Sequence, residues 1–196
     1  MESKREGNDY AMAIRNILLD GDRSLLKKSR EVTDFNKRLH LLLDDMRETL
    51  CEVNGLGLAA PQVGVLRRAA LIVDTSIESE NIEEQIIELV NPEILAKSGE
   101  QSGSEGCLSF PGRYGIVKRP EMVRIKAQDR YGKPFELWGK ELTARAICHE
   151  VDHLDGIVFT TLAEKFLTEE ELDALASEDE KDETNQENEQ GDVDNK

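Results

Sequence analysis

The chain has 196 residues, and its 41 acidic residues against 25 lysines and arginines give a formal net charge of −16 at pH 7. This length predicts one domain with tails. The acidic balance argues against electrostatic binding of nucleic acid, direct DNA binding included. No apolar run approaches the length of a membrane span, and the three cysteines lack a disulfide-framework spacing, so we expect a reduced, cytoplasmic protein without membrane contact.

Three segments differ in composition. Residues 1–10 form a polar leader without the apolar core of a secretion signal. Residues 11–167 carry the regular apolar patterns and are expected to form the catalytic body. Residues 168–196 hold thirteen acidic residues, two lysines and no aromatic residue, so we expect disorder after a short helix that begins with the capping-box pair Thr168 and Glu171. A solubilising tail is the plain interpretation, and a basic partner is the alternative.

The first half of the body opens with a helix. Apolar residues recur at helical spacing in "TDFNKRLHLLLDDMRETLCEV", with Thr33 or Asp34 as the cap and Asn54-Gly55 as the end. His40 lies beside the apolar stripe and is interpreted as an ordinary surface histidine. "RRAALIVD" predicts a strand, and the acidic stretch 76–88 predicts a loop. "IIELVNPEI" then predicts a strand that stops at Asn91-Pro92.

The second half combines a hairpin with a second helix. "MVRIKAQD" and "PFELWG" flank a turn at 129–132 and predict paired strands. A helix is expected from near Thr143 to Gly156, which is a good residue to end it. "GIVFTTL" predicts a short strand or an extended exit. Because strands and helices do not alternate regularly, the pattern favours an α+β fold.

The stretch "ICHEVDHLDG" holds two of the three histidines of the chain. His149 and His153 are four residues apart, so they share one face of a helix and can bind one metal ion. Glu150 lies close enough to act as a general base without being a ligand, which is the H-E-x-x-H arrangement. The plain alternative is a surface helix with two unremarkable histidines.

A catalytic metal site needs a third protein ligand and one open position. Cys107, in "EGCLSFPG", would complete a Cys/His/His set, although a free cysteine is often a small buried apolar residue. Glu164 is the alternative ligand in a thermolysin-like scheme. In "GLGLAAPQVG", Gly55 and Gly57 permit an added peptide strand, and Gln62 offers an amide donor to an oxyanion.

These three pieces, in this order, resemble the motifs of the peptide deformylase family. The family motifs are G-x-G-L-A-A-x-Q, E-G-C-L-S and H-E-x-x-H with Asp before the last His, and they match residues 55–62, 105–109 and 149–153. The resemblance extends over most of residues 11–165. It implies small antiparallel sheets around a central metal-binding helix, and removal of the N-formyl group from the initiator methionine of new proteins with release of formate.

The resemblance also implies residue roles. Cys107, His149 and His153 would bind one divalent ion, most often Fe²⁺ in this family, with Zn²⁺, Ni²⁺ or Co²⁺ as alternatives. Glu150 would be the general acid/base. Gln62 and the backbone N–H of Leu108 would stabilise the oxyanion. Gly55, Leu56 and Gly57 would bind the N-formyl-methionyl peptide, and transient contact with the ribosome is implied.

The chain departs from the family pattern at three places. Cys148 precedes His149 where the family often has Gln, and Gly112-Arg113-Tyr114 follows "CLSFP" where many members continue differently. The acidic tail contrasts with the basic C-terminal helix by which some members reach the ribosome. A further hypothesis is that Asp152 and Arg119 form a buried ion pair that orients the helix.

Two other functions fit part of the sequence. A zincin-like endopeptidase would explain H-E-x-x-H but neither Cys107 nor Gln62. A non-catalytic formyl-peptide binder would have no need to retain Cys107, Glu150 and Gln62 together. The sequence therefore favours a metal-dependent peptide deformylase.

Overall fold

The computed structural model describes residues 13–175, and the predicted leader at 1–10 and most of the predicted tail, from residue 176 on, lie outside the described residues. The labelled helices of this part are α1 (Lys37–Val53), α2 (Ile82–Gln85) and α3 (Glu141–Asp155), with short 3₁₀ turns η1 (Arg23–Leu26), η2 (Ala60–Val63) and η3 (Phe159–Thr161), and a last short helix covers residues 169–175. The strands are β1 (Gly57–Ala59), β2 (Ala69–Val73), β3 (Ile86–Ser98), β4 (Gln101–Gly106), β5 (Tyr114–Arg119), β6 (Met122–Gln128), β7 (Pro134–Lys140) and β8 (Lys165–Phe166).

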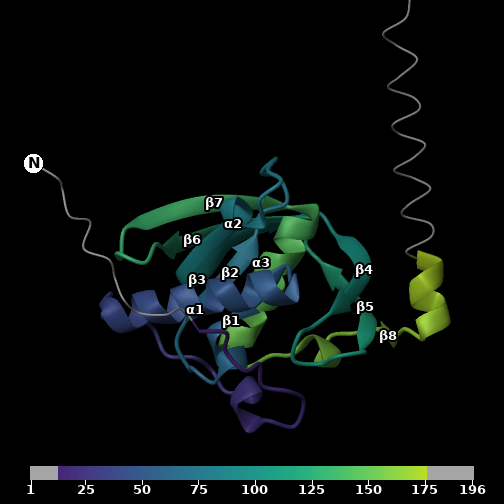
Figure 1. The fold of residues 1–196 in the computed structure, drawn as a ribbon. Helices are drawn as coiled ribbons and strands as arrows, with labels where there is room; N and C mark the ends of the chain where they lie inside the picture. The colour runs from purple at the N-terminus through teal and green to yellow at the C-terminus, as the bar shows by residue number, and fades with distance from the viewer. Residues whose placement is uncertain (1–12, 176–196) are drawn as a thin grey trace, which may run out of the picture.

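The strands form two antiparallel sheets. The larger has the order β1-β2-β3-β6-β7, and the smaller has the order β4-β5-β8. Helix α3 lies between them, and α1 crosses the larger sheet (Figure 1). The predicted α+β class, with small antiparallel sheets around a central helix, is confirmed. Within the described residues, no helix is long and apolar enough to span a bilayer.

Strand β2 of the larger sheet is apolar and buried along its whole length, with neighbours packed on both of its faces. On β2, Leu71 and Val73 pack in the cluster that contains the apolar face of α1, while Ile72 packs in the cluster that contains Ile147 of α3. Side chains of a strand alternate between its two faces, so residues of β2 pack against α1 on one face and against α3 on the other. The site-bearing helix is thereby packed against one face of the larger sheet.

The N-terminal cap of helix α1 lies two residues after Asp34, the later of the two predicted caps. Its cap is Asn36, whose side chain accepts from the backbone N–H of Arg38 and Leu39, so Thr33 and Asp34 were the wrong choices. The predicted end is correct, since Asn54 adopts a left-handed conformation with φ 49°. Helix α3 was also predicted, and it ends as expected at Gly156, with φ 76°.

Strand β3 corrects two predictions. It continues through Asn91-Pro92 to Ser98 instead of stopping there, because a register shift between Val90 and Glu93 gives the proline a place outside the regular ladder. Asn91 has φ 51°, and its side chain bonds both backbone groups of Val32. The predicted loop 76–88 contains α2 and the first residues of β3.

Three further predictions concern the hairpin, the segment after α3 and the short helix near residue 168. The β6–β7 hairpin was predicted and is present. Residues 156–162 contain the 3₁₀ turn η3, at Phe159–Thr161, and no strand, where a short strand or extended exit was predicted. Residues 169–175 are helical, and Thr168 and Glu171 exchange backbone-to-side-chain hydrogen bonds at 3.1 and 3.2 Å.

Candidate active site

The three candidate metal ligands come together from two elements. His149 and His153 lie on successive turns of α3, and Cys107 directly follows β4. Cys107 Sγ is 3.2 Å from His153 Nε2, and one donor atom from each of the three residues lies within 4.8 Å of the others. One thiol and two imidazoles at this spacing fit a divalent transition-metal ion.

Glu105 fixes the orientation of His149. Its carboxylate is 3.1 Å from His149 Nδ1, which must donate because Arg119 and Arg145 also donate to this carboxylate. Burial opposes ionisation of Glu105, but hydrogen bonds from His149 and Arg119 outweigh it and lower the pKa of Glu105 to about 2. The second ring nitrogen of His149 is thereby left to face Cys107 and His153.

The two histidines differ in their protonation. Burial opposes a proton on His149, but hydrogen bonds with Cys107 and Glu105 raise the pKa of His149 to about 10. Burial and the nearby charge of His149 place the pKa of His153 well below its ordinary value. A metal ion at this site would therefore displace a proton from His149, whereas His153 already offers a lone pair.

The hypothesised ion pair between Arg119 and Asp152 is confirmed. Arg119 Nη1 lies 2.6 Å from Asp152 Oδ2, while its Nε and Nη2 donate to Glu105 at 2.7 and 3.0 Å. Arg119 is 7% exposed. The pair therefore joins the ligand-bearing helix to β4 and β5 from inside the protein.

Glu150 is buried beside the candidate ligands. It is 3% exposed, and its Oε2 has no hydrogen-bond partner among residues 13–175. Burial raises the pKa of Glu150 to about 7. A carboxyl group with a pKa near neutrality can both accept and return a proton, as general acid–base catalysis requires.

Gln62 is held with its amide nitrogen toward the same space. Its Oε1 accepts from the backbone N–H of Ala59 at 2.8 Å, so Nε2 points the other way, to Ser109 Oγ at 3.2 Å and Cys107 Sγ at 3.5 Å. The residue is 1% exposed. An amide held this rigidly is suited to donate to a developing negative charge.

A cavity of about 440 Å³ connects these groups to the surface. One wall is the segment Gly55, Leu56 and Gly57, which leads into β1, an edge strand of the larger sheet. The opposite wall is β4, an edge strand of the smaller sheet, followed by Cys107 and Leu108. His149 and Glu150 of α3 also line the cavity. An extended peptide could therefore pair with a free strand edge while its end reaches the candidate ligands.

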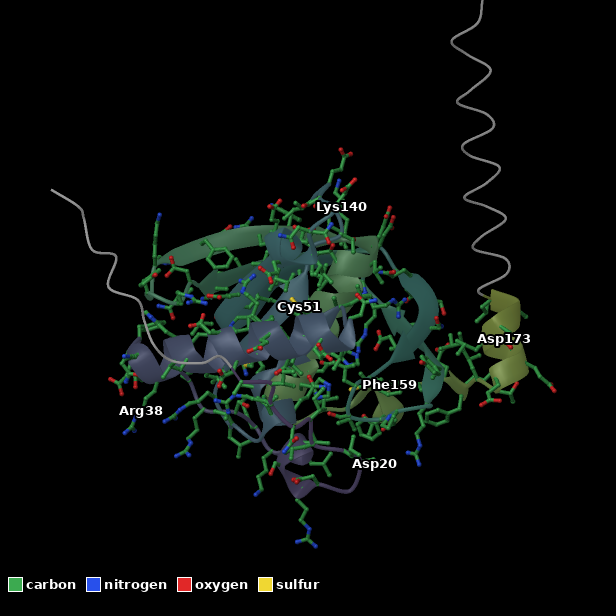
Figure 2. The ribbon with its side chains drawn as sticks, in the orientation of Figure 1. Asp20, Arg38, Cys51, Lys140, Phe159 and Asp173 are labelled. Carbon is green, nitrogen blue, oxygen red and sulfur yellow. The ribbon has the colours of Figure 1, made fainter. Side chains whose placement is uncertain are left out.

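Aromatic side chains close the inner side of the site. Phe159 stacks on His149 at a centroid distance of 6.1 Å and meets Phe110 edge to face at 5.8 Å. Phe159 is 1% exposed, and Figure 2 labels it beside the smaller sheet. Cys107 packs against the same cluster. This apolar backing keeps bulk water from the ligand side and strengthens charge interactions there.

The other sequence candidates lie elsewhere. Glu164 is half exposed and pairs with Lys118 at 3.1 Å, so it is not a third ligand. His40 Nε2 donates to the Arg130 carbonyl at 2.8 Å, away from the cavity. Cys148 is buried in the cluster between α3 and the larger sheet.

Sequence reasoning assigned no role to three polar residues of this region: Glu105 and Ser109, which begin and end the motif of Cys107, and Arg145. Ser109 is fully buried against Gln62, and Arg145 is buried against Glu105. Each contact joins residues at least 40 positions apart, so no local spacing could have indicated it. Arg145 did carry one signal, since it stands one turn before His149 on the same helix.

The site and fold define an amide hydrolase of the deformylase type, and comparison with known proteins agrees. The polypeptide deformylase family model matches residues 14–167. The peptide deformylase of Caldicellulosiruptor bescii is 51% identical over 85% of this chain and 95% of its own length, and peptide deformylase 1 of Bacillus subtilis is 48% identical over 82% and 97%. A peptide deformylase structure from Legionella pneumophila has a TM-score of 0.71 at 40% identity, covering 84% of this chain and 96% of that one. The chain belongs to the peptide deformylase family.

Proposed function

We propose that this enzyme hydrolyses the formyl amide of N-formyl-methionyl peptides and releases formate with the aid of one divalent metal ion. The observation that carries the proposal is a single cavity shared by Cys107, His149, Glu150 and Gln62, with His153 beside them, in a chain of the deformylase family. A general base, an amide donor and a metal-ligand set are the parts that amide hydrolysis needs.

Cys107, His149 and His153 would hold the ion, each through one donor atom. When bound, a divalent ion polarises the formyl carbonyl and lowers the pKa of the attacking water toward neutrality. The donor set does not select iron, because zinc binds nitrogen and sulfur ligands at least as well. The preference for Fe²⁺ over Zn²⁺, Ni²⁺ or Co²⁺ rests on the family resemblance. We expect the Fe²⁺ form to be more active but sensitive to air, since a thiolate beside a redox-active ion is readily oxidised.

Glu150 is the proton carrier in this proposal. Its carboxylate takes a proton as the water oxygen attacks the formyl carbon, and it returns that proton to the methionine nitrogen as the carbon–nitrogen bond breaks. The products are formate and a peptide with a free amino group. Its burial and its pKa near 7 support both halves of this exchange.

Gln62 and the backbone N–H of Leu108 would stabilise the negative charge that develops on the formyl oxygen. The fixed direction of Gln62 Nε2 supports this role, because a donor oriented before the reaction needs no reorganisation. Leu108 lines the same cavity next to Cys107.

The peptide would bind as an added strand along Gly55, Leu56 and Gly57. The free edge of β1 supports this mode. A peptide ligand is supported by a Met-Ala-Ser-bound structure of the Acinetobacter baumannii class I type b peptide deformylase, which is 32% identical with a TM-score of 0.71 over 78% of this chain and 99% of that one. Newly made proteins carry the formyl group, so we place the enzyme in the cytoplasm with transient ribosome contact. Its three free cysteines fit a reduced setting.

The catalytic body would be residues 11–167, with 1–10 as a leader and 168–196 as an accessory tail. The family match ends at residue 167. β8, at Lys165–Phe166, completes the smaller sheet just before that end. The body is thus expected to contain every element that the reaction needs.

The deciding experiment measures formate release from a formyl-methionyl peptide alongside cleavage of casein. We expect formate release and no internal cleavage. Casein cleavage without formate release would favour a zincin-like endopeptidase instead. Tight peptide binding with no turnover would favour a non-catalytic binder.

A further inference from the structure

Arg145 is a buried cation that the proposed hydrolysis does not use. It lies on α3 one turn before His149 and is 7% exposed. Its Nη1 donates to Glu105 Oε1 at 3.0 Å and to the carbonyls of Val117 and Gly103 at 3.1 and 3.3 Å. The guanidinium therefore ties α3 to β4 and β5 at the level of the candidate ligands.

Glu105 connects Arg145 to His149. One carboxylate oxygen accepts from Arg119 and Arg145, and the other accepts from Arg119 and from His149 Nδ1. Arg119 also pairs with Asp152, so by itself it would face two carboxylates. Arg145 supplies the second positive charge. Since an uncompensated buried charge is strongly unfavourable, Arg145 helps to hold the Glu105 carboxylate in place against His149.

Gly103 leaves the space that the guanidinium occupies. A β-carbon at Gly103 would lie 3.0 Å from Arg145 Nη2, which is closer than ordinary contact. Gly103 also pairs with Val117 across β4 and β5, so both carbonyl acceptors belong to one strand pair. A side chain at position 103 would therefore require the guanidinium of Arg145 to shift by a few tenths of an ångström.

We propose that Arg145 is a positioning residue that sets the metal affinity of the site by acting through Glu105 on His149. The inference rests on the proposed metal ligation by Cys107, His149 and His153. A carboxylate that accepts from a metal-ligating histidine fixes its tautomer and ring orientation. Loss of such support typically weakens metal affinity about 10- to 100-fold.

A direct role for Arg145 in peptide binding is the competing explanation, because Arg145 also lines the cavity. The geometry favours positioning. Its Nη1 already serves three acceptors, and Nη2 lies 3.5 Å from Gln101 Oε1. The small exposed fraction leaves little of the guanidinium for a substrate. The two roles differ in what they change: positioning changes metal affinity, whereas peptide binding changes KM alone.

The test titrates Zn²⁺-loaded enzyme with a competing chelator and records the absorption spectrum of the Co²⁺-loaded form. We expect Arg145→Met to weaken metal affinity about 10- to 100-fold and to alter the Co²⁺ spectrum, with Arg145→Lys intermediate. Arg68→Met is the matched control. Arg68 donates to Asp155 Oδ1 at 2.7 Å, so this control removes an arginine contact from the same helix without touching Glu105. Its metal affinity should stay within about threefold of wild type, inside the error of such comparisons.

Two further variants keep the inference testable if Arg145→Met does not fold. Gly103→Ala retains the charge but displaces the guanidinium, and it should weaken metal affinity several-fold. In a Glu105→Gln background, Arg145→Lys should have much less effect on metal affinity than it has alone, because Arg145 acts through Glu105.

The outcomes separate this inference from the proposed function. If wild-type enzyme binds one ion and releases formate, but the Arg145 and Gly103 variants bind metal as tightly, the inference is wrong and the function stands. A raised KM with unchanged metal affinity would likewise overturn it in favour of peptide binding. If wild-type enzyme binds no metal at Cys107, His149 and His153, both fail.

Discussion

Glu150 occupies the space that a side chain at Gly57 would need. A β-carbon built on Gly57 would lie 2.8 Å from both Cγ and Cδ of Glu150 and closer still to Oε1. Gly57 is the first residue of β1, and Glu150 is on α3, so the glycine lets the edge strand approach the helix at the proposed proton carrier. The sequence suggested that this glycine admits a peptide strand. The structure adds a second reason for a glycine at position 57, which is that any side chain there would collide with Glu150.

Gly57→Ala should therefore impair catalysis by displacing Glu150. Real β-carbons do not approach other atoms this closely, so the carboxylate has to shift. A misplacement on the order of 1 Å at a catalytic group can cost roughly 100-fold in rate. Formate-release kinetics and bound-metal content check this prediction, with a fall in kcat and an unchanged metal content expected. Wild-type kcat in this variant would show that Glu150 has room to move or no role.

Glu150→Gln should keep the metal and lose nearly all turnover. The carboxylate is proposed as the proton carrier and not as a ligand, and such groups typically contribute about 100- to 10,000-fold. The amide has nearly the same shape, so the unfolding temperature should change little. Metal analysis together with formate release decides the matter. Loss of the ion from the variant would instead identify Glu150 as a ligand.

A chain that ends at Leu167 should fold and retain activity on a short formyl peptide. The helix at residues 169–175 lies at the periphery beyond β8, where Figure 2 labels Asp173. One link between this helix and the body is an exposed ion pair between Lys165 and Glu171, and exposed pairs contribute little. We expect the melting temperature to fall by at most a few degrees.

A shorter chain that ends at Glu164 is the matched comparison. It removes β8, whose residues pair with Gly115 and Ile116, together with the bond from Leu167 N–H to the Tyr114 carbonyl. This truncation should destabilise the smaller sheet and lower both the melting temperature and the activity. Equal stability of the two truncated chains would contradict the boundary at residue 167.

Glu88 should make the stability of the fold depend on acid pH. Glu88 on β3 accepts from Arg130 and from Arg47 of α1. Burial opposes its ionisation, but these arginines outweigh burial and hold the pKa of Glu88 below its usual value of 4.5. A lowered pKa stabilises the fold at pH values above 4.5, and this contribution is lost as pH falls through the lowered pKa.

Glu88→Gln should consequently be less stable than wild type at pH 7, by roughly 1–3 kcal/mol. The difference should narrow as pH falls below 4.5. Urea unfolding of both proteins at a series of pH values measures it. If the difference in unfolding free energy between the two proteins stays constant as the pH falls well below 4.5, the charge of Glu88 has no part in stability.

The sequence predicted the parts of the fold that local patterns determine. The α1 and α3 periodicities, the β6–β7 hairpin and the left-handed ends at Asn54 and Gly156 follow from spacing and from residue conformation. The path of β3 could not be predicted in this way. Pro92 locally predicts a strand end, and only the bulge and the contacts of Asn91 with Val32 allow the strand to continue.

The residues of the candidate site also fall into two groups: those that local sequence motifs predict and those whose role depends on the fold. His149, Glu150 and His153 form a helical motif that the sequence displays directly, and Cys107 and Gln62 lie in short motifs of their own. Arg145 lies outside these motifs, and Ser109 ends the motif of Cys107 without any role that the sequence assigns to it. Their importance comes from contacts with Glu105 and Gln62, which depend on how two edge strands meet a helix in three dimensions.

The central claim is that one divalent ion at Cys107, His149 and His153 is required for removal of the formyl group. The most direct measurement is the rate of formate release from a formyl-methionyl peptide, followed against bound metal as a chelator strips enzyme purified anaerobically with Fe²⁺ and as Fe²⁺ is then restored. The account predicts a rate proportional to bound metal, with full activity at one ion per chain, and a Cys107→Ser variant that binds the ion weakly. Formate release that persists at full rate after the metal is removed, or a Cys107→Ser variant with full metal and normal rate, would contradict it.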